Sequence, residues 1–199
     1  MITCNIVHMY ENILEAFRYA SFQVAAIITT TGFCTADFNL WPELSKCILL
    51  TLMVIGASAG STGGGIKVSR LMILLKSIKQ EIHRFLHPKA VTIVKVNGRK
   101  ISNETMRGVN IYFVCYVMII IGSVLLVSFD NFDFETTFTS VMTTINNVGP
   151  GFSLVGPVEN FAKFSVLSKL VFCVDMLVGR LEIFPFLLLF SPNLWRKRF

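Results

Sequence analysis

A short motif occurs twice in this sequence, and the repeat limits the folds that the chain can adopt. The first copy is TTTGF at residues 29–33 and the second is NNVGPGF at residues 146–152, so that Gly32 and Gly149 are 117 positions apart. An apolar segment of helical pattern leads into each copy. A helix that runs into a glycine-containing turn is typical of a re-entrant pore loop, which offers backbone carbonyl oxygens to an ion in place of water. The repeat therefore predicts part of an ion pathway.

Composition places the chain in a membrane. Hydrophobic residues make up 53% of the sequence and charged residues only 15%, against roughly 25% charged in soluble domains. Residues 108–129 carry no charge over 22 positions, which is enough to cross a hydrocarbon core that needs about 20. A buried helix of a soluble protein is seldom apolar over so many turns, so we expect a transmembrane span here.

The charges are distributed unevenly. Ten of the eighteen lysines and arginines lie between Lys67 and Arg107, and residues 196–198 add three more. The positive-inside rule places both stretches in the cytoplasm, which predicts a multi-pass protein of the inner (plasma) membrane with a cytoplasmic C-terminus. The basic stretches lie beside membrane segments and contain no nucleic-acid motif, so we expect no nucleic-acid partner. The acidic residues near the two turns would face the other side and attract cations: Asp37, Glu43, Asp130, Asp133, Glu135 and Glu159.

The pattern of apolar residues predicts two short pore helices and one membrane helix that is interrupted by glycines. Residues 13–31 and 134–145 read as short pore helices, and residues 41–58 read as a membrane helix. That helix meets a glycine-rich stretch at residues 56–65, where each glycine costs about 1 kcal/mol of helix stability relative to alanine, and the helical pattern resumes at Ile66. Broken helices mark ion pathways in transporters. The alternative is a flexible linker between two ordinary helices.

The last third of the chain supplies a candidate partner for this break. A linker with a hairpin at residues 91–100 precedes the uncharged span, and a final helix covers residues 160–190. Arg180 follows Gly149 by 31 positions, as Gly63 follows Gly32. If the repeats are built alike, Arg180 lies at the depth of the glycine-rich break, where its guanidinium can donate to loop carbonyls. The alternative is that Arg180 pairs with a carboxylate of its own helix, at position 175 or 182.

Four strings together resemble the Trk/Ktr/HKT superfamily of potassium transporters: TTTGF, GASAGSTGGGIK, NNVGPGF and VGRLEIFP. The resemblance implies an all-α membrane protein with helix–pore-loop–helix repeats around a pseudo-fourfold ion pore. It implies a partial third repeat without its first helix at residues 1–82, a cytoplasmic linker at 83–106 and a complete fourth repeat at 107–199. The chain is then the C-terminal half of a transporter subunit, or two copies combine into a pore.

The resemblance also implies roles for individual residues. The selectivity filter would consist of Thr30, Thr31, Gly32, Phe33, Asn147, Val148, Gly149 and Pro150. Six of them would bind K+ through backbone carbonyls: Thr30, Thr31, Gly32, Asn147, Val148 and Gly149. The gate below the filter would consist of Gly60, Ser61, Thr62, Gly63, Gly64, Gly65 and Arg180.

The implied function is passive K+ uptake through a gated pore, with no enzymatic activity and no cofactor apart from K+ as the transported ion. The implied partners are the membrane, the N-terminal repeats, a second copy in a homodimer, and a cytosolic nucleotide-binding RCK subunit. A sodium-permeable or Na+/K+ transporter of the same family is the first alternative, and an accessory subunit without a pore is another. A membrane enzyme that binds phosphate with GSTGGGIK is disfavoured, because a Walker A lysine is followed by Ser or Thr and Lys67 is followed by Val68.

Overall fold

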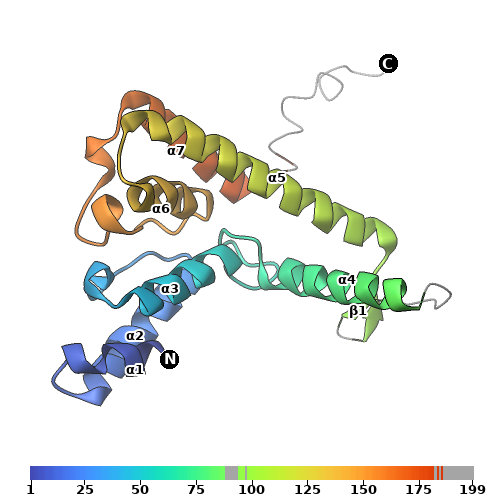
Figure 1. Ribbon diagram of the computed structural model, residues 1–199, viewed down its shortest axis with the longest axis horizontal. Coiled ribbons are helices and arrows are strands. Elements are labelled where there is room, and N and C mark those ends of the chain that lie inside the picture. Colours follow the sequence, from blue (N-terminus) through green and yellow to red (C-terminus); the bar gives the residue numbers. More distant parts are fainter. Residues whose placement is uncertain (88–93, 97, 182, 184, 186–199) are drawn as a thin grey trace.

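The protein is almost entirely helical, and its helices form two groups (Figure 1). A computed structural model describes residues 1–87, 94–96, 98–181, 183 and 185. The first group and the long helix that follows it are α1 (Ile2–Ile6), α2 (Ile13–Ile28), α3 (Glu43–Ile55) and α4 (Val68–Leu86). The second group is α5 (Asn103–Val127), α6 (Phe134–Ile145) and α7 (Val166–Leu181), and the described strands are β1 (Lys95–Val96) and β2 (Arg99–Lys100). The predicted all-α class is confirmed.

Two short helices occupy the positions of the predicted pore helices. At 1.5 Å per residue, the twelve residues of α6 extend about 18 Å, which is too short to cross a hydrocarbon core of about 30 Å. The α6 helix begins where Asp133 accepts a hydrogen bond from the Thr136 backbone N–H at 3.0 Å, and it has the predicted bounds. The α2 helix stops at Ile28, three residues before the predicted end, because the chain turns at Thr29 and Thr30.

The predicted helix break lies between α3 and α4. The α3 helix begins after Pro42, which lacks the N–H that a helix interior requires, and it ends at Gly56, whose φ of +67° suits glycine. The observed helix is therefore shorter than the predicted 41–58. The α4 helix resumes at Val68, two residues later than predicted, because Lys67 adopts a positive φ of 75°.

Backbone hydrogen bonds bridge the break. The Ile66 N–H donates to the Val54 carbonyl at 3.1 Å, and the Lys67 N–H donates to the Ile55 carbonyl at 3.0 Å. These carbonyls belong to the last turn of α3, where a helix leaves its acceptors without intrahelical donors. The segment between them, residues 56–65, is therefore a closed loop that leaves the helix and returns to it, which differs from an open linker. We call residues 56–65 the intramembrane loop.

The α5 helix and the 3-10 turn that follows it contain the predicted transmembrane span, residues 108–129. Among the residues that the structure describes, one helix, Asn103–Asp130 with its final 3-10 turn, is long and apolar enough to cross a bilayer. Large apolar side chains are exposed along α5 and α7, and exposed apolar patches mark contact with a membrane or with another protein surface: Ile111, Val114, Met118, Ile121, Leu125, Val166, Leu170, Val174 and Leu177.

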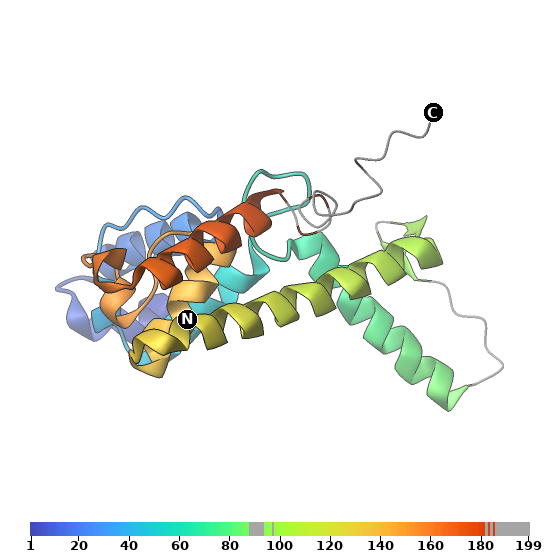
Figure 2. The ribbon, with the colours of Figure 1, turned by 90° about the horizontal axis from the view of Figure 1, so that it is seen from above.

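The final helix and the linker differ from their predicted bounds. The α7 helix begins at Val166 rather than at residue 160, because Asn160 caps a 3-10 turn and the Ser165 hydroxyl accepts the Ser168 N–H at 3.2 Å. The predicted end at residue 190 lies outside the described residues. The predicted hairpin reduces to the pair β1 and β2, since residues 91–93 and 97 also lie outside the described part. Figure 2 shows α4 diverging from α5, with the hairpin at the N-terminal end of α5.

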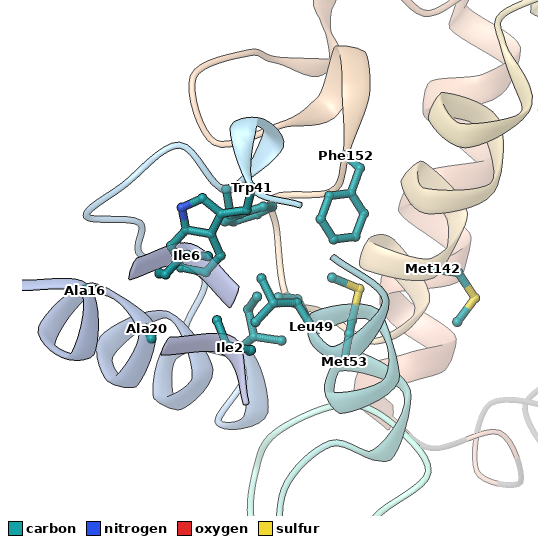
Figure 3. Packing of buried hydrophobic residues seen from close by; sticks show 12 residues of the cluster. Ile2, Ile6, Ala16, Ala20, Trp41, Leu49, Met53, Met142 and Phe152 are labelled. Atoms are coloured by element: carbon teal, nitrogen blue, oxygen red, sulfur yellow. The ribbon is translucent and has the colours of Figure 1, made fainter. Parts of the chain in front are cut away.

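Apolar side chains from both groups share one core. Trp41, Leu49 and Met53 of the first group pack in the same cluster as Met142 and Phe152 of the second (Figure 3). Phe152 lies edge-on to Phe38, with 5.3 Å between the ring centroids. This shared core holds the two pore-loop turns next to each other.

Candidate ion pathway

The two repeated turns have the same backbone conformation. Thr30 and Asn147 are equivalent at the spacing of 117 positions, and each has a φ of 54°. Gly32 and Gly149 are also equivalent, with φ of 74° and 113°. Positive φ is uncommon outside glycine, so this shared pattern is a specific similarity between the turns. We call residues 29–34 the first pore loop and residues 146–151 the second pore loop.

The turns also share their hydrogen bonds. In each loop, backbone N–H groups donate to carbonyls in the last turns of the preceding helix. The matching pairs are Thr29 to Ala25 and Asn146 to Met142, Thr30 to Ile27 and Asn147 to Thr144, and Thr31 to Ala26 and Val148 to Thr143, all between 2.9 and 3.2 Å. These bonds use the N–H groups, so the loop carbonyl oxygens are the polar groups available to a cation. The C-termini of both helices carry partial negative charge, which also favours a cation at the loops.

The first pore loop lies directly against the second. A Cβ atom added to Gly32 would overlap the carbonyl oxygen of Val148. A Cβ atom added to Gly149 would meet no atom within 4 Å. Glycine is therefore required at position 32 by both its φ and its neighbour, and at position 149 by its φ.

Different side chains support the two loops. In the second loop the Thr143 hydroxyl accepts from the Gly149 N–H at 2.9 Å and donates to the Pro150 carbonyl at 3.1 Å. In the first loop the Gln23 Nε2 donates to Cys34 Sγ at 3.2 Å. The Cys34 thiol in turn donates to the Gly32 carbonyl at 3.7 Å. These supporting side chains were not predicted from the sequence.

The segments that follow the loops are joined by one side chain. The Asn39 amide donates to the Ser153 carbonyl at 3.1 Å and accepts from the Ser153 N–H at 3.0 Å. Gly156 provides the space, because a Cβ there would overlap the Asn39 amide. No sequence pattern singled out Asn39, since its partner is 114 positions away.

The intramembrane loop contacts both pore loops. The Gly64 N–H donates to Thr30 Oγ1 at 3.3 Å, and a Cβ on Gly64 would overlap the Asn146 carbonyl. Gly63 lies against the Thr30 hydroxyl in the same way. The structure therefore brings the predicted gate residues next to the predicted filter residues.

Two cations bind the carbonyls of the intramembrane loop. Arg180 Nη1 donates to the Thr62 carbonyl. Its alternative partner Asp175 accepts a hydrogen bond from Ser123 at 2.7 Å, and residue 182 lies outside the described residues. Lys67 Nζ donates to the Ser61 carbonyl at 2.6 Å and to the Gly63 carbonyl. Lys67 is only 8% exposed, and its position two residues after the glycine run was the available signal for its contact with the loop.

A small polar cavity of about 140 Å³ lies beside this loop. Its walls include Lys67, Arg180 and Arg70, and the Arg70 guanidinium is 4.1 Å from the centroid of the Tyr112 ring. These side chains place three positive charges on this side of the loop.

The remaining predicted site residues lie at the edges of the site. Thr31 and Phe33 are exposed, and Pro150 is partly buried. Gly60 is exposed at the tip of the intramembrane loop with a φ of 79°, whereas Gly65 is buried against Gly56.

An acidic group lies at the other end of α6. Hydrogen bonds from the Thr136 hydroxyl and backbone N–H lower the pKa of Asp133 below its usual value. Asp133 is therefore ionised near neutral pH, at the N-terminus of the pore helix, where the helix dipole favours negative charge.

Comparison with known proteins agrees with this arrangement. The model of the TrkH cation transport protein family matches residues 5–197. The chain is 36% identical to the Trk system potassium uptake protein TrkH of Salmonella typhimurium, over 99% of this chain and 41% of that protein. It is 35% identical to TrkG of Escherichia coli, over 92% of this chain and 37% of that protein.

A solved structure shows the same fold. The crystal structure of the potassium transporter TrkH from Vibrio parahaemolyticus matches with a TM-score of 0.88 and 36% identity, over 98% of this chain and 42% of that one. The chain thus spans about two fifths of the length of the relatives that it matches. Since the family model covers nearly the whole sequence, the chain belongs to the TrkH family of cation transport proteins.

Proposed function

We propose that this chain forms half of the pore of a potassium uptake system in the cell membrane. The observation that carries the proposal is the pair of pore loops with the same backbone, 117 positions apart, that meet at Gly32 and Val148. Their carbonyls, with those of Thr30, Thr31, Asn147 and Gly149, replace the hydration shell of K+. The names of the relatives, which are potassium uptake proteins, support K+ as the ion.

The intramembrane loop acts as the gate in this proposal. It lies against both pore loops, and Arg180 and Lys67 hold it there through its carbonyls. Hydrogen bonds from charged donors contribute about 1.5–3 kcal/mol each. The closed state is therefore stable, but it can be released if α7 carries Arg180 away. A role as a phosphate cradle is disfavoured because the Lys67 ammonium is already bonded to the loop.

The rest of the transporter completes the pore. Two pore loops enclose an ion on two sides only, so the remaining repeats supply the other carbonyls. We further propose a homodimer in the inner membrane, with several spans and a cytoplasmic C-terminus. A cytosolic nucleotide-binding RCK subunit docks on the basic cytoplasmic segments and regulates the gate.

A chimera tests the function. Residues 1–199 replace the matching two fifths of the Vibrio parahaemolyticus relative, and the chimera is expressed in a bacterium that lacks its own potassium uptake systems. We expect growth at low external K+ and uptake of radioactive rubidium, which substitutes for K+. The chimera with Arg18→Ala, an exposed α2 residue remote from the loops, serves as the control for substitution as such.

Three results contradict parts of the proposal. Membrane-inserted chimera that takes up no rubidium overturns the pore assignment. Uptake that is faster for sodium than for rubidium favours the sodium-permeable alternative. Growth of cells that express residues 1–199 alone shows that copies of this chain build a pore without the other repeats.

A further inference from the structure

The two pore loops follow the same path, but polar groups of different kinds restrain them. In the second loop the restraint acts on the Gly149 N–H and the Pro150 carbonyl, through Thr143. At the equivalent position in the first loop the sequence has Ala26, which has no polar side-chain atom. The Gly32 N–H instead donates to the Ala26 backbone carbonyl at 3.2 Å, so a side-chain restraint on a carbonyl of the first loop comes from another residue.

That support comes from a line of two hydrogen bonds. Gln23 projects from α2 and is 0% exposed. Its amide donates to Cys34 Sγ at 3.2 Å, and the thiol donates to the Gly32 carbonyl at 3.7 Å. The two hydrogen bonds connect the α2 helix to the Gly32 carbonyl of the first pore loop.

Burial restricts the movement of the Gln23 side-chain amide. Within the part of the chain that the structure describes, Gln23 Oε1 has no hydrogen-bond partner although it is buried. A buried amide with an unmatched oxygen is costly, so Gln23 is not an inert filler of an apolar core. In the described structure, the hydrogen bond from Gln23 Nε2 to Cys34 Sγ offsets part of this cost.

We infer that Gln23 and Cys34 are positioning residues that set the ion preference of the first pore loop by restraining the Gly32 carbonyl. The inference rests on the proposed function and deepens it. Discrimination between K+ and Na+ depends on the size of the carbonyl cage or on the strength and flexibility of its dipoles. A restraint on one carbonyl changes the size of the cage or the flexibility of its dipoles, and it does not block the pore.

The test compares close variants of Cys34 in the chimera. Cys34→Ala removes the link between Gln23 and Gly32, and Cys34→Ser keeps a group that can both donate and accept. We expect the rubidium-to-sodium uptake ratio to fall about twofold to threefold in Cys34→Ala, as for a hydrogen bond at the weak end of the usual range, because a thiol is a weak donor. Cys34→Ser should retain most of the ratio. Cys47→Ala, at an exposed cysteine of α3, should leave it unchanged.

A double-mutant cycle connects the two residues. Gln23→Leu should lower the same ratio, and the double variant Gln23→Leu/Cys34→Ala should be no worse than the poorer single one, because one line of bonds is broken only once. If Gln23→Leu does not fold, the comparison of Cys34→Ala with Cys34→Ser still decides the matter.

The outcomes separate this inference from the proposed function. Rubidium uptake by the unsubstituted chimera establishes the pore independently. If the pore conducts and the Cys34→Ala ratio equals that of Cys47→Ala, the positioning role is wrong and the pore assignment stands. A fall in uptake of both ions at a constant ratio also overturns the inference, since it shows a structural role only.

Discussion

The two pore-loop units, α2 with the first loop and α6 with the second, have one backbone and two different surroundings. Nine of the twelve α6 residues are buried, whereas five of the sixteen α2 residues are. The α6 helix meets this burial with hydroxyl groups that bond to nearby carbonyls, such as Thr139 to Glu135 at 2.7 Å. The equivalent residue in α2 is Phe22, which is exposed.

The difference shows what determines the path of a pore loop. The helix end and the positive φ at two positions are common to both units, so they are sufficient to direct the chain. The side chains that support the loop are not shared, so they can change without altering the path. We therefore expect substitutions of the first kind to reduce ion uptake strongly and substitutions of the second kind to change it only slightly.

The largest effect should come from the glycines. Gly149→Ala places a side chain at positive φ, which costs about 1–2 kcal/mol, and we expect roughly a tenfold loss of rubidium uptake by the chimera. Gly32→Ala carries the same strain and also overlaps the Val148 carbonyl, so uptake should fall to background. Equal losses in the two variants would contradict the contact between the loops.

The next effect concerns the helices that follow the two pore loops. The intramembrane loop interrupts the helix after the first pore loop, between α3 and α4, whereas α7 after the second pore loop is continuous over Val166–Leu181. Arg180→Ala and Lys67→Met each remove a charged donor from the intramembrane loop, and such a bond contributes about 1.5–3 kcal/mol. We expect passive rubidium flux through the chimera to rise about tenfold or more. Arg18→Ala provides the matched loss of an arginine. A decrease in flux would show that these cations support conduction instead of closing the gate.

A smaller effect should follow from the support of the second loop. Thr143→Val keeps the shape of the side chain but removes its bonds to Gly149 and Pro150, and we expect a loss of about 1 kcal/mol of stability together with a lower rubidium-to-sodium ratio. Thr51→Val is the control, because the Thr51 hydroxyl bonds only within α3. An unchanged melting temperature in detergent and an unchanged ratio would contradict the support by Thr143.

The smallest effect should come from the helix starts. Asp133 caps α6 through its side chain, whereas Asn12 at the start of α2 makes no such bond. Asp133→Ala should cost about 1 kcal/mol of the free energy of unfolding, and Asn12→Ala should cost almost nothing. Thermal melting of the purified chimera measures both.

The same cap predicts a pH dependence with a definite sign. The pKa of Asp133 is lowered in the folded state, so its contribution is complete above the unfolded pKa of about 3.9. It is lost as the pH falls through the lower folded value. The stability difference between wild type and Asp133→Ala should therefore shrink on acidification below about pH 4. A difference that grows on acidification would contradict the lowered pKa.

Local signals predicted much of the fold. The spacing of 117 positions located both pore helices, and the glycine-rich stretch at residues 56–65 located the break after α3. The predicted end of α3 at residue 58 was too late, because the helix already ends at Gly56. The start of α7 was placed at residue 160 because the apolar pattern does not show that Asn160 and Ser165 form separate caps.

The site was only partly predictable, for a physical reason. The contact of Arg180 with the intramembrane loop followed from the repeat, which carries spatial information over a long sequence distance. Asn39 and Gln23 have partners that no repeat links to them, so their roles became visible only once the chain was folded. From the sequence, Lys67 was considered only as the lysine of a Walker A motif, which the sequence does not complete. Its binding to the carbonyls of the intramembrane loop was not predicted.

The hydrogen bonds between Asn39 and Ser153 make one joint between the repeats different from the next. The residue equivalent to Asn39 in the second unit is Gly156, which receives the Asn39 amide and has no side chain to extend toward a further neighbour. The contact therefore has a direction: the first unit reaches over the second, and the second does not reach onward in the same way. In the proposed pore, a joint between repeats that lacks this bond should move more easily than the joint that has it. We therefore expect the mouth of the proposed pore to widen on one side rather than evenly.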